Sequence, residues 1–293
     1  MKKKLSIFIT IIVLNLTCAT NYTILKALVF AKHGEQSPVI FLKNDEKIWP
    51  FGPNKITING KKSAHTFGEF LKIRYIEQYN LIEKYRTSET LFQSTQSESS
   101  IMSSIIALAK LFEPKSVEQH HWDKDIDYVP VPIHMILKSR DFILFPESCK
   151  YIIDANKKIM EQVKFKEILE ENKEFIDKIN DLKLLKGKMN FTDLHNLAQN
   201  LIVKKSNDIP LPEWANNKMG DETYEIKLFN INQKLKKVFY NNKNYYTTAA
   251  SFPISTVLDD FQGVLDGTDV TKFELYVAVK LELASTTISS KKS

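Results

Sequence analysis

Arginine and cysteine are both scarce in this sequence, and each shortage removes a type of structure or chemistry. The 293 residues include three arginines, Arg74, Arg86 and Arg140, whereas lysine and arginine together number 41. The basic residues are therefore almost all lysines, whose ammonium group lacks the planar fork with which guanidinium holds phosphate. One of the two cysteines, Cys18, lies in a predicted signal peptide. Cys149 would then be alone in the mature chain, which excludes an internal disulfide.

A long apolar run is also missing from the N-terminus, where the stretch "LSIFITIIVLNL" has 12 residues. That length is short for a membrane span and typical of the apolar region of a secretory signal. Lys2, Lys3 and Lys4 precede the run, and the small residues of "TCAT" follow it. We therefore predict a signal peptide over 1–19, a secreted mature chain and no stable membrane span. An uncleaved anchor is the alternative.

Composition indicates an ordinary globular protein, since apolar, aromatic and charged residues make up 43%, 11% and 26% of the chain. Removal of the three signal lysines lowers the formal charge from +6 to about +3, which gives no reason to expect nucleic-acid binding. Two sequons, at Asn21 and Asn190, predict glycosylation if they are exposed. No cofactor is expected.

Hydrophobic patterning predicts an α/β fold, with a mixed sheet flanked by helices and a smaller helical lobe at about 140–220. The domain is expected to span 20–284, followed by a disordered tail over 285–293. Extended segments are predicted at 23–31, 129–136, 244–252 and 273–283. Helices are predicted at 60–85, 99–112, within 150–184, and at 191–205, 222–240 and 254–261.

The stretch "VFAKHGEQSPVI", residues 29–40, has an apolar strand running into a turn built around His33. Such a turn is the usual place for a site in an α/β sheet. "AKHGEQSP" resembles the "RHGxRxP" signature of the histidine acid phosphatases. Similar stretches follow in the order of that family, so that the resemblance covers about 23–284: "WPFGPNKITINGKKSAHTFGEFLKIRYIE", "SSIMSSIIALAKLFEP", "VPVPIH", "FPESCKY", "LPEW" and "VLDGTDVTKFELYVAVKLEL".

The resemblance implies that His33 is a nucleophile that forms a phosphohistidine, with arginines neutralising the phosphate dianion. Lys32 stands where the first arginine is expected, which keeps the charge and loses the fork. Gln36 and Gln93 stand at the next two arginine positions, and Ser99 at a further one. A general drift toward lysine would have kept charge at these three positions, so it does not explain them.

The family also has a His-Asp pair, whose acid protonates the leaving alcohol. The pair falls on Ala250 and Ser251, or one residue later, so the family proton donor is missing. Glu35 or Glu98 are substitute acids that the sequence leaves open. We therefore expect an impaired phosphatase that acts by binding a small-molecule or phosphorylated ligand. The alternative is an active acid phosphatase that works through a phosphohistidine at His33.

Two adjacent histidines, His120 and His121, lie close in sequence to Asp123 and Asp125. Adjacent histidines and carboxylates are a combination that metals favour, but no distant further ligand is evident in the sequence. A polar loop is therefore the preferred interpretation, and no metal site is expected.

Overall fold

The structure is a computed structural model that describes residues 10–12, 23–114, 123, 125–185, 187 and 189–278. The described residues form two compact units. The first comprises those within Met1–Gly34, Ile58–Cys149 and Ala249–Ser293, and the second those within Glu35–Thr57 and Lys150–Thr248. Over the described ranges, no helix is both long and apolar enough to cross a bilayer.

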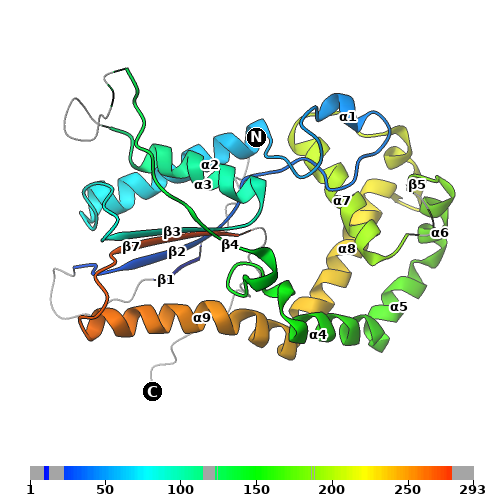
Figure 1. The fold of residues 1–293 in the computed structure, drawn as a ribbon. Helices are drawn as coiled ribbons and strands as arrows, with labels where there is room; N and C mark the ends of the chain where they lie inside the picture. The colour runs from blue at the N-terminus through cyan, green and yellow to red at the C-terminus, as the bar shows by residue number, and fades with distance from the viewer. Residues whose placement is uncertain are drawn as a thin grey trace. The chain divides into compact units, whose positions relative to one another are not determined.

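A five-stranded sheet forms the centre of the first unit, in the order β1-β2-β7-β3-β4 (Figure 1). The strands are β1 (Thr10–Ile12), β2 (Ala27–Lys32), β3 (Thr90–Thr95), β4 (His134–Ile136) and β7 (Phe273–Ala278). β2, β7, β3 and β4 run parallel, whereas β1 is antiparallel to β2. The predicted α/β fold with a mixed sheet is confirmed. β7, the last of these strands in the chain, pairs with β2 on one side and β3 on the other.

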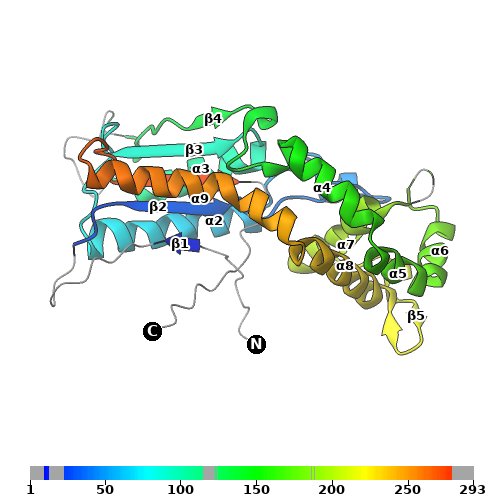
Figure 2. The ribbon, with the colours of Figure 1, turned by 90° about the horizontal axis from the view of Figure 1, so that it is seen from below.

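Helices cover both faces of this sheet, as two views of the ribbon show (Figures 1 and 2). α2 (Ile58–Leu71) and α3 (Glu98–Leu111) lie on one face, and α9 (Lys243–Leu265) lies on the other. Alternate strand residues serve the two layers, because successive side chains of a strand point to opposite faces. Val29 and Leu275 belong to the core with α2 and α3. The rings of Phe30 and Tyr276 stack with their centroids 4.8 Å apart, in the core that includes residues of α9.

The helix predicted over 60–85 is shorter than its apolar pattern suggested. α2 continues into a π-helical segment, Lys72–Gln78, in which the Tyr79 amide donates to the Arg74 carbonyl at 3.1 Å. Asn80 then takes a positive φ of 46°. Asparagine tolerates this left-handed conformation and commonly follows the end of a helix. The residues after 80 carry apolar side chains into the core without being helical, and Ile82 is fully buried there.

The second unit is mainly helical. Its elements are α1 (Asp45–Ile48), α4 (Lys150–Glu161), α5 (Val163–Glu171), α6 (Lys173–Asp181), α7 (Phe191–Ser206) and α8 (Tyr224–Tyr240), with the hairpin strands β5 (Lys218–Met219) and β6 (Glu222–Thr223). The segment 35–57 is fastened to α7 through the fully buried Asp45. Its carboxylate receives Lys204 Nζ at 2.5 Å and Asn200 Nδ2 at 2.6 Å. A buried carboxylate needs such partners, because an unpaired charge is costly to desolvate.

The strand predicted at 244–252 is wrong, since these residues lie in α9. Paired tyrosines and threonines favour strands, and proline is disfavoured inside a helix, yet Pro253 lies within α9. The buried residues nevertheless recur every fourth position, at Tyr245, Ala249, Pro253 and Val257. Thr247 and Thr248 donate their hydroxyls to carbonyls four residues earlier, at 2.7 and 2.8 Å. Helical periodicity therefore outweighs local β propensity here.

The packing of α2 on α3 predicts that Gly68→Ala destabilises the first unit. A Cβ at Gly68 would lie 2.2 Å from the Ala107 carbonyl oxygen, so backbone must shift. We expect a loss of about 1–3 kcal/mol in the free energy of unfolding, measured with urea, although alanine is the better helix former. Thr66→Ala, at an exposed position of the same helix, is the matched control. A Gly68→Ala variant as stable as that control would contradict the packing argument.

Candidate functional site

His33 lies directly beyond β2, at the carboxyl ends of the parallel strands. Its backbone amide donates to the Ala278 carbonyl at 3.0 Å, which extends the pairing of β2 with β7 by one residue. The side chain is buried, with 7% of its surface exposed. In open α/β sheets this edge is where ligands bind, so the sequence motif and the topology agree on the place.

The His33 ring is held in one orientation by its own turn. Nδ1 lies 2.5 Å from the Gly34 carbonyl oxygen, and a carbonyl only accepts, so Nδ1 carries the proton. Nε2 then holds the free lone pair; it is buried and has no hydrogen-bond partner within the described part of the chain. Burial lowers the pKa of His33 to about 4, the charge of Lys32 adds to this, and the Gly34 contact opposes it. The ring is therefore a neutral imidazole, as a histidine nucleophile must be.

Close packing positions the turn that follows. A Cβ at Gly34 would lie 2.3 Å from the Gly60 carbonyl oxygen, at the start of α2. The Gly34 amide donates to Ser103 Oγ at 2.9 Å, and that hydroxyl in turn donates to the Ser99 carbonyl at 2.6 Å. Only glycine fits this approach of α2, and α3 supplies the polar partner. Gly60 and Ser103 carry no local sequence signal for these roles.

The expected phosphate-binding positions of the first unit carry little positive charge. Lys32 is the exposed last residue of β2. Gln93 lies in β3, opposite Tyr276 and His134 on the neighbouring strands. Its Nε2 is buried and finds no partner in the ranges that the structure describes. Ser99 is fully buried in the first turn of α3.

Gln36 and Glu35 belong to the second unit. Gln36 forms an isolated antiparallel bridge with Ile56, and its Nε2 donates to Asn54 Oδ1 at 3.3 Å. Glu35, a substitute acid suggested by the sequence, receives Thr57 Oγ1 at 2.8 Å on Oε1.

The same carboxylate of Glu35 also accepts from two residues of the second unit beyond the 35–57 segment. Asn207 Nδ2 donates to Oε1 at 2.6 Å, and Ser206 Oγ donates to Oε2. Both oxygens of Glu35 are thus engaged in holding its own segment. Glu98, the other substitute acid, is exposed in the first turn of α3.

The positions of the family His-Asp pair lie on a helix rather than beyond a strand. Ala250 is half-buried and Ser251 exposed, both within α9. Neither residue therefore follows directly on a strand, as His33 does. Neither side chain is an acid, so neither supplies a proton to a leaving group at ordinary pH.

Some predicted positions lie outside the described residues: Asn21, the pair His120 and His121, most of the signal peptide and the tail. Asn190 is described and exposed. It caps α7, accepting from the Asp193 amide through Oδ1 at 3.0 Å.

Three carboxylates that no sequence motif brings together, from Asp260, Asp269 and Glu274, form a cluster in the first unit. One oxygen of each lies within 4.8 Å of the others, and the cation among them is the ammonium of Lys26. The ammonium of Lys26 contacts the cluster, at 2.5 Å from Asp269 and 2.6 Å from Glu274. Lys26 lies in the extended segment predicted at 23–31, and that local pattern gives no signal of partners some 240 residues away.

The buried imidazole predicts a pH-dependent stability. The pKa of His33 in the folded state lies below its ordinary value of 6.5. The contribution of the neutral ring to the free energy of unfolding is therefore complete above pH 6.5 and is lost as pH falls toward 4. We expect the free energy of unfolding to fall less between pH 7 and 4.5 in His33→Gln than in the wild type, by up to about 3 kcal/mol. His65→Gln, at an exposed histidine of α2, should keep the wild-type slope. Equal slopes in all three proteins would contradict a buried neutral ring.

Comparison with known sequences finds similar acid phosphatases. The bovine (Bos taurus) prostatic acid phosphatase is 31% identical over 121 residues, which cover 40% of this chain and 30% of the relative. The lysosomal acid phosphatase of Xenopus laevis is 25% identical over 218 residues, covering 70% and 49%. The venom acid phosphatase of Apis mellifera is 22% identical over 224 residues, covering 72% and 56%. The chain thus spans about half the length, or less, of these relatives. No protein-family model matches it.

Solved structures agree on the fold. A Klebsiella phytase superposes with a TM-score of 0.56 at 13% identity, covering 88% of this chain and 70% of that one. A Citrobacter braakii phytase superposes with a TM-score of 0.56 at 9% identity, and the match covers 87% of this chain and 72% of the phytase chain. At such low identity these matches show the fold alone, and the curated sequences supply the relationship. The similarity to prostatic, lysosomal and venom acid phosphatases supports a relationship to the histidine acid phosphatase family.

Proposed function

We propose that this acid-phosphatase-like protein is catalytically impaired and acts by binding a small-molecule or phosphorylated ligand. The observation that carries the proposal is the loss of charge at the family's arginine positions. Gln36, Gln93 and Ser99 are neutral there, and Lys32 offers a single ammonium group. A phosphate dianion needs preorganised cationic donors most strongly in the transition state.

The missing acid supports the same proposal. Ala250 and Ser251 lie on α9 and cannot protonate an alcohol, and Glu35 is engaged by three donors of its own unit. Removal of one oxyanion-type donor lowers kcat by roughly 10²- to 10³-fold. Such losses are not additive, but three neutral replacements together with a missing acid leave little basis for turnover.

An active but slow acid phosphatase is the second candidate, and one observation favours it. The Nδ1 contact with Gly34 gives His33 the tautomer and the orientation of a nucleophile, with the lone pair on Nε2. Attack by Nε2 on phosphorus would form the N–P bond as the P–O bond to the alcohol breaks. The alcohol oxygen would then need a proton, and Glu98 is the substitute acid that lies in the first unit.

We further propose that the chain is secreted, with a signal peptide over 1–19, a phosphatase-like domain over 20–284 and a tail over 285–293. The basic and apolar pattern of the first residues supports this organisation, and the sequon at Asn190 is exposed. The names of similar acid phosphatases include venom and lysosomal proteins, which fits a chain that enters the secretory route.

Hydrolysis of p-nitrophenyl phosphate between pH 4 and 7 tests the main proposal. We expect the wild type and His33→Ala to show equal rates, at background level, because the charge-neutralising groups are missing. His65→Ala, at an exposed histidine, controls for substitution in general. Turnover that His33→Ala abolishes and His65→Ala does not would overturn the proposal. Acid-labile labelling of His33 by the substrate would then establish the second candidate.

Secretion makes a separate prediction at Asn190. The cap of α7 uses Oδ1, whereas a glycan attaches at Nδ2, so modification leaves the helix cap intact. Protein secreted from eukaryotic cells should therefore lose mass when treated with a peptide N-glycosidase. Thr192→Ala, which destroys this sequon and keeps Asn190, should remove the part of the mass that this site contributes. An unchanged mass in Thr192→Ala would show that the sequon is unused.

A further inference from the structure

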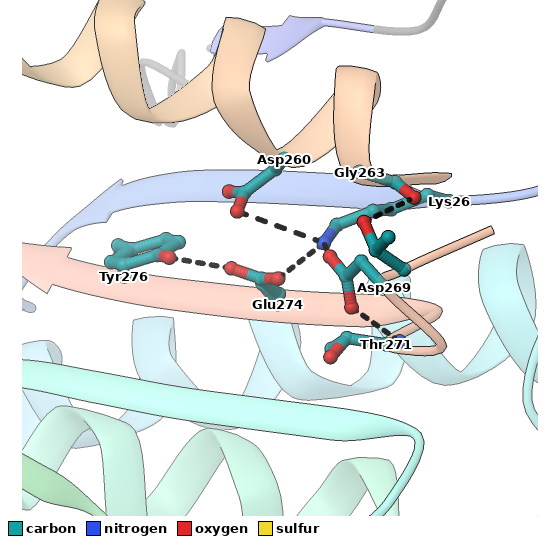
Figure 3. A network of polar contacts seen from close by, with 8 residues as sticks. Lys26, Asp260, Gly263, Asp269, Thr271, Glu274 and Tyr276 are labelled. Carbon is teal, nitrogen blue, oxygen red and sulfur yellow. Dashed lines mark hydrogen bonds and ion pairs between the residues drawn. The ribbon is translucent and has the colours of Figure 1, made fainter. Parts of the chain in front are cut away.

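Five polar side chains meet where α9, the turn after it and the sheet come together in the first unit (Figure 3). They are Lys26 before β2, Asp260 on α9, Asp269 after α9, and Glu274 and Tyr276 on β7. Lys26 is 4% exposed and Glu274 is 2% exposed, so the centre of the group is dry. We call these five residues the Lys26 cluster. One ammonium faces three carboxyl groups in it.

Two of the three carboxyl groups are fully matched by donors. Glu274 receives Lys26 Nζ on Oε1 at 2.6 Å and the Tyr276 hydroxyl on Oε2 at 2.5 Å. Asp269 receives Lys26 Nζ on Oδ2 at 2.5 Å and the Thr271 amide on Oδ1 at 2.8 Å. Every oxygen of this pair therefore has a partner, and charge-assisted bonds of this kind favour the ionised carboxylate.

The third carboxyl group, of Asp260, is poorly matched. Its Oδ1 lies 3.9 Å from Lys26 Nζ, which is beyond hydrogen-bond distance. Its Oδ2 is buried and has no partner among the described residues. If all three carboxyl groups were ionised, the cluster would carry a net charge of −2. Like charges this close in a partly dry site favour protonation of one of the three carboxyl groups. Asp260 is the group to be protonated, because it receives the fewest hydrogen bonds and its ionised form is stabilised least.

We propose that the Lys26 cluster is an acid-stabilised clasp, which fastens α9 to β7 most firmly when Asp260 carries a proton. Proton uptake leaves the two matched carboxylates on Lys26 and removes one repulsive charge. It also turns one Asp260 oxygen into a hydroxyl that can donate to a neighbouring carboxylate. The exposed Asp259, next to it on α9, adds a further negative charge that favours the protonated form.

The sign of the effect follows from the direction of the pKa shift. Burial, then the charge of Glu274, raise the pKa of Asp260 from 3.8 to about 6, and Lys26 opposes them. Because the pKa of Asp260 is raised in the folded state, its protonation adds to the free energy of unfolding fully below about pH 3.8. This added stability is lost as pH rises through about 6. Burial, then the charge of Glu274, raise the pKa of Tyr276, which stays a hydroxyl donor throughout.

The test compares the full chain with Asp260→Asn, whose amide imitates the neutral acid. We expect its folding equilibrium constant at pH 7.5 to exceed that of the wild type by tenfold or more. The ratio of the two folding equilibrium constants should reach at most about 100-fold, because the pKa of Asp260 is raised by about two units and each unit changes the equilibrium constant tenfold. Below about pH 3.8, where Asp260 is protonated in the folded and the unfolded chain alike, the two proteins should be nearly equal. Asp266→Asn, at an exposed aspartate just after α9, is the matched control and should follow the wild type.

His33 titrates over an overlapping range with the opposite sign, so only the difference between variants isolates the clasp. An Asp260→Asn protein with the wild-type pH slope would overturn the proposal. If that variant does not fold, carboxyl-carbon NMR of wild-type Asp260 decides the question. An apparent pKa near 6 would support the clasp, and a value below about 4.5 would overturn it.

Discussion

The parallel pairing of β7 with β2 and β3 is the interaction on which the first unit depends. All six residues of β7 are buried, and they join a strand near the start of the chain to another that follows α2. Without β7, β2 and β3 would present unpaired backbone groups to each other across a gap. The amide of His33 also bonds to the last residue of β7, so the end of the chain's final described strand fixes the turn that bears the site. Such non-local pairing must wait for both ends of the domain, which slows folding.

Sequence patterns predicted the parts of this structure that local periodicity controls. The turn at His33, the helix α3 and the strand β7 all follow from apolar spacing and a glycine. The same patterns failed at α9, where tyrosine and threonine pairs suggested a strand and the four-residue spacing of buried positions was missed. They also failed for contacts between distant segments. Nothing around Lys26 indicates that Asp269 and Glu274 will meet it, and Ser103 gives no local sign that it supports Gly34.

The candidate site combines a buried neutral histidine with neighbours of the same unit that carry little positive charge. Gly34 sets the His33 tautomer, whereas Gln93 offers a neutral amide and Ser99 a neutral hydroxyl. Two groups in the same unit respond to acid in opposite directions. Burial keeps His33 neutral and makes acid destabilising there, while burial and then neighbouring carboxylates raise the pKa of Asp260 and make acid stabilising. Both responses fall within the pH range in which an acid phosphatase is assayed, so stability and activity must be measured together at each pH.

The contact between Gly34 and Gly60 has a consequence for how such proteins are recognised. The carbonyl of Gly60 occupies the space that any side chain at position 34 would need. A chain with this packing requires glycine after the histidine whether or not it hydrolyses phosphate. The His-Gly pair therefore reports that a strand end lies against the start of a helix, and it can persist in a protein that has no turnover. Assignment of an enzymatic role from this pair requires the charged residues around it, which the packing does not dictate.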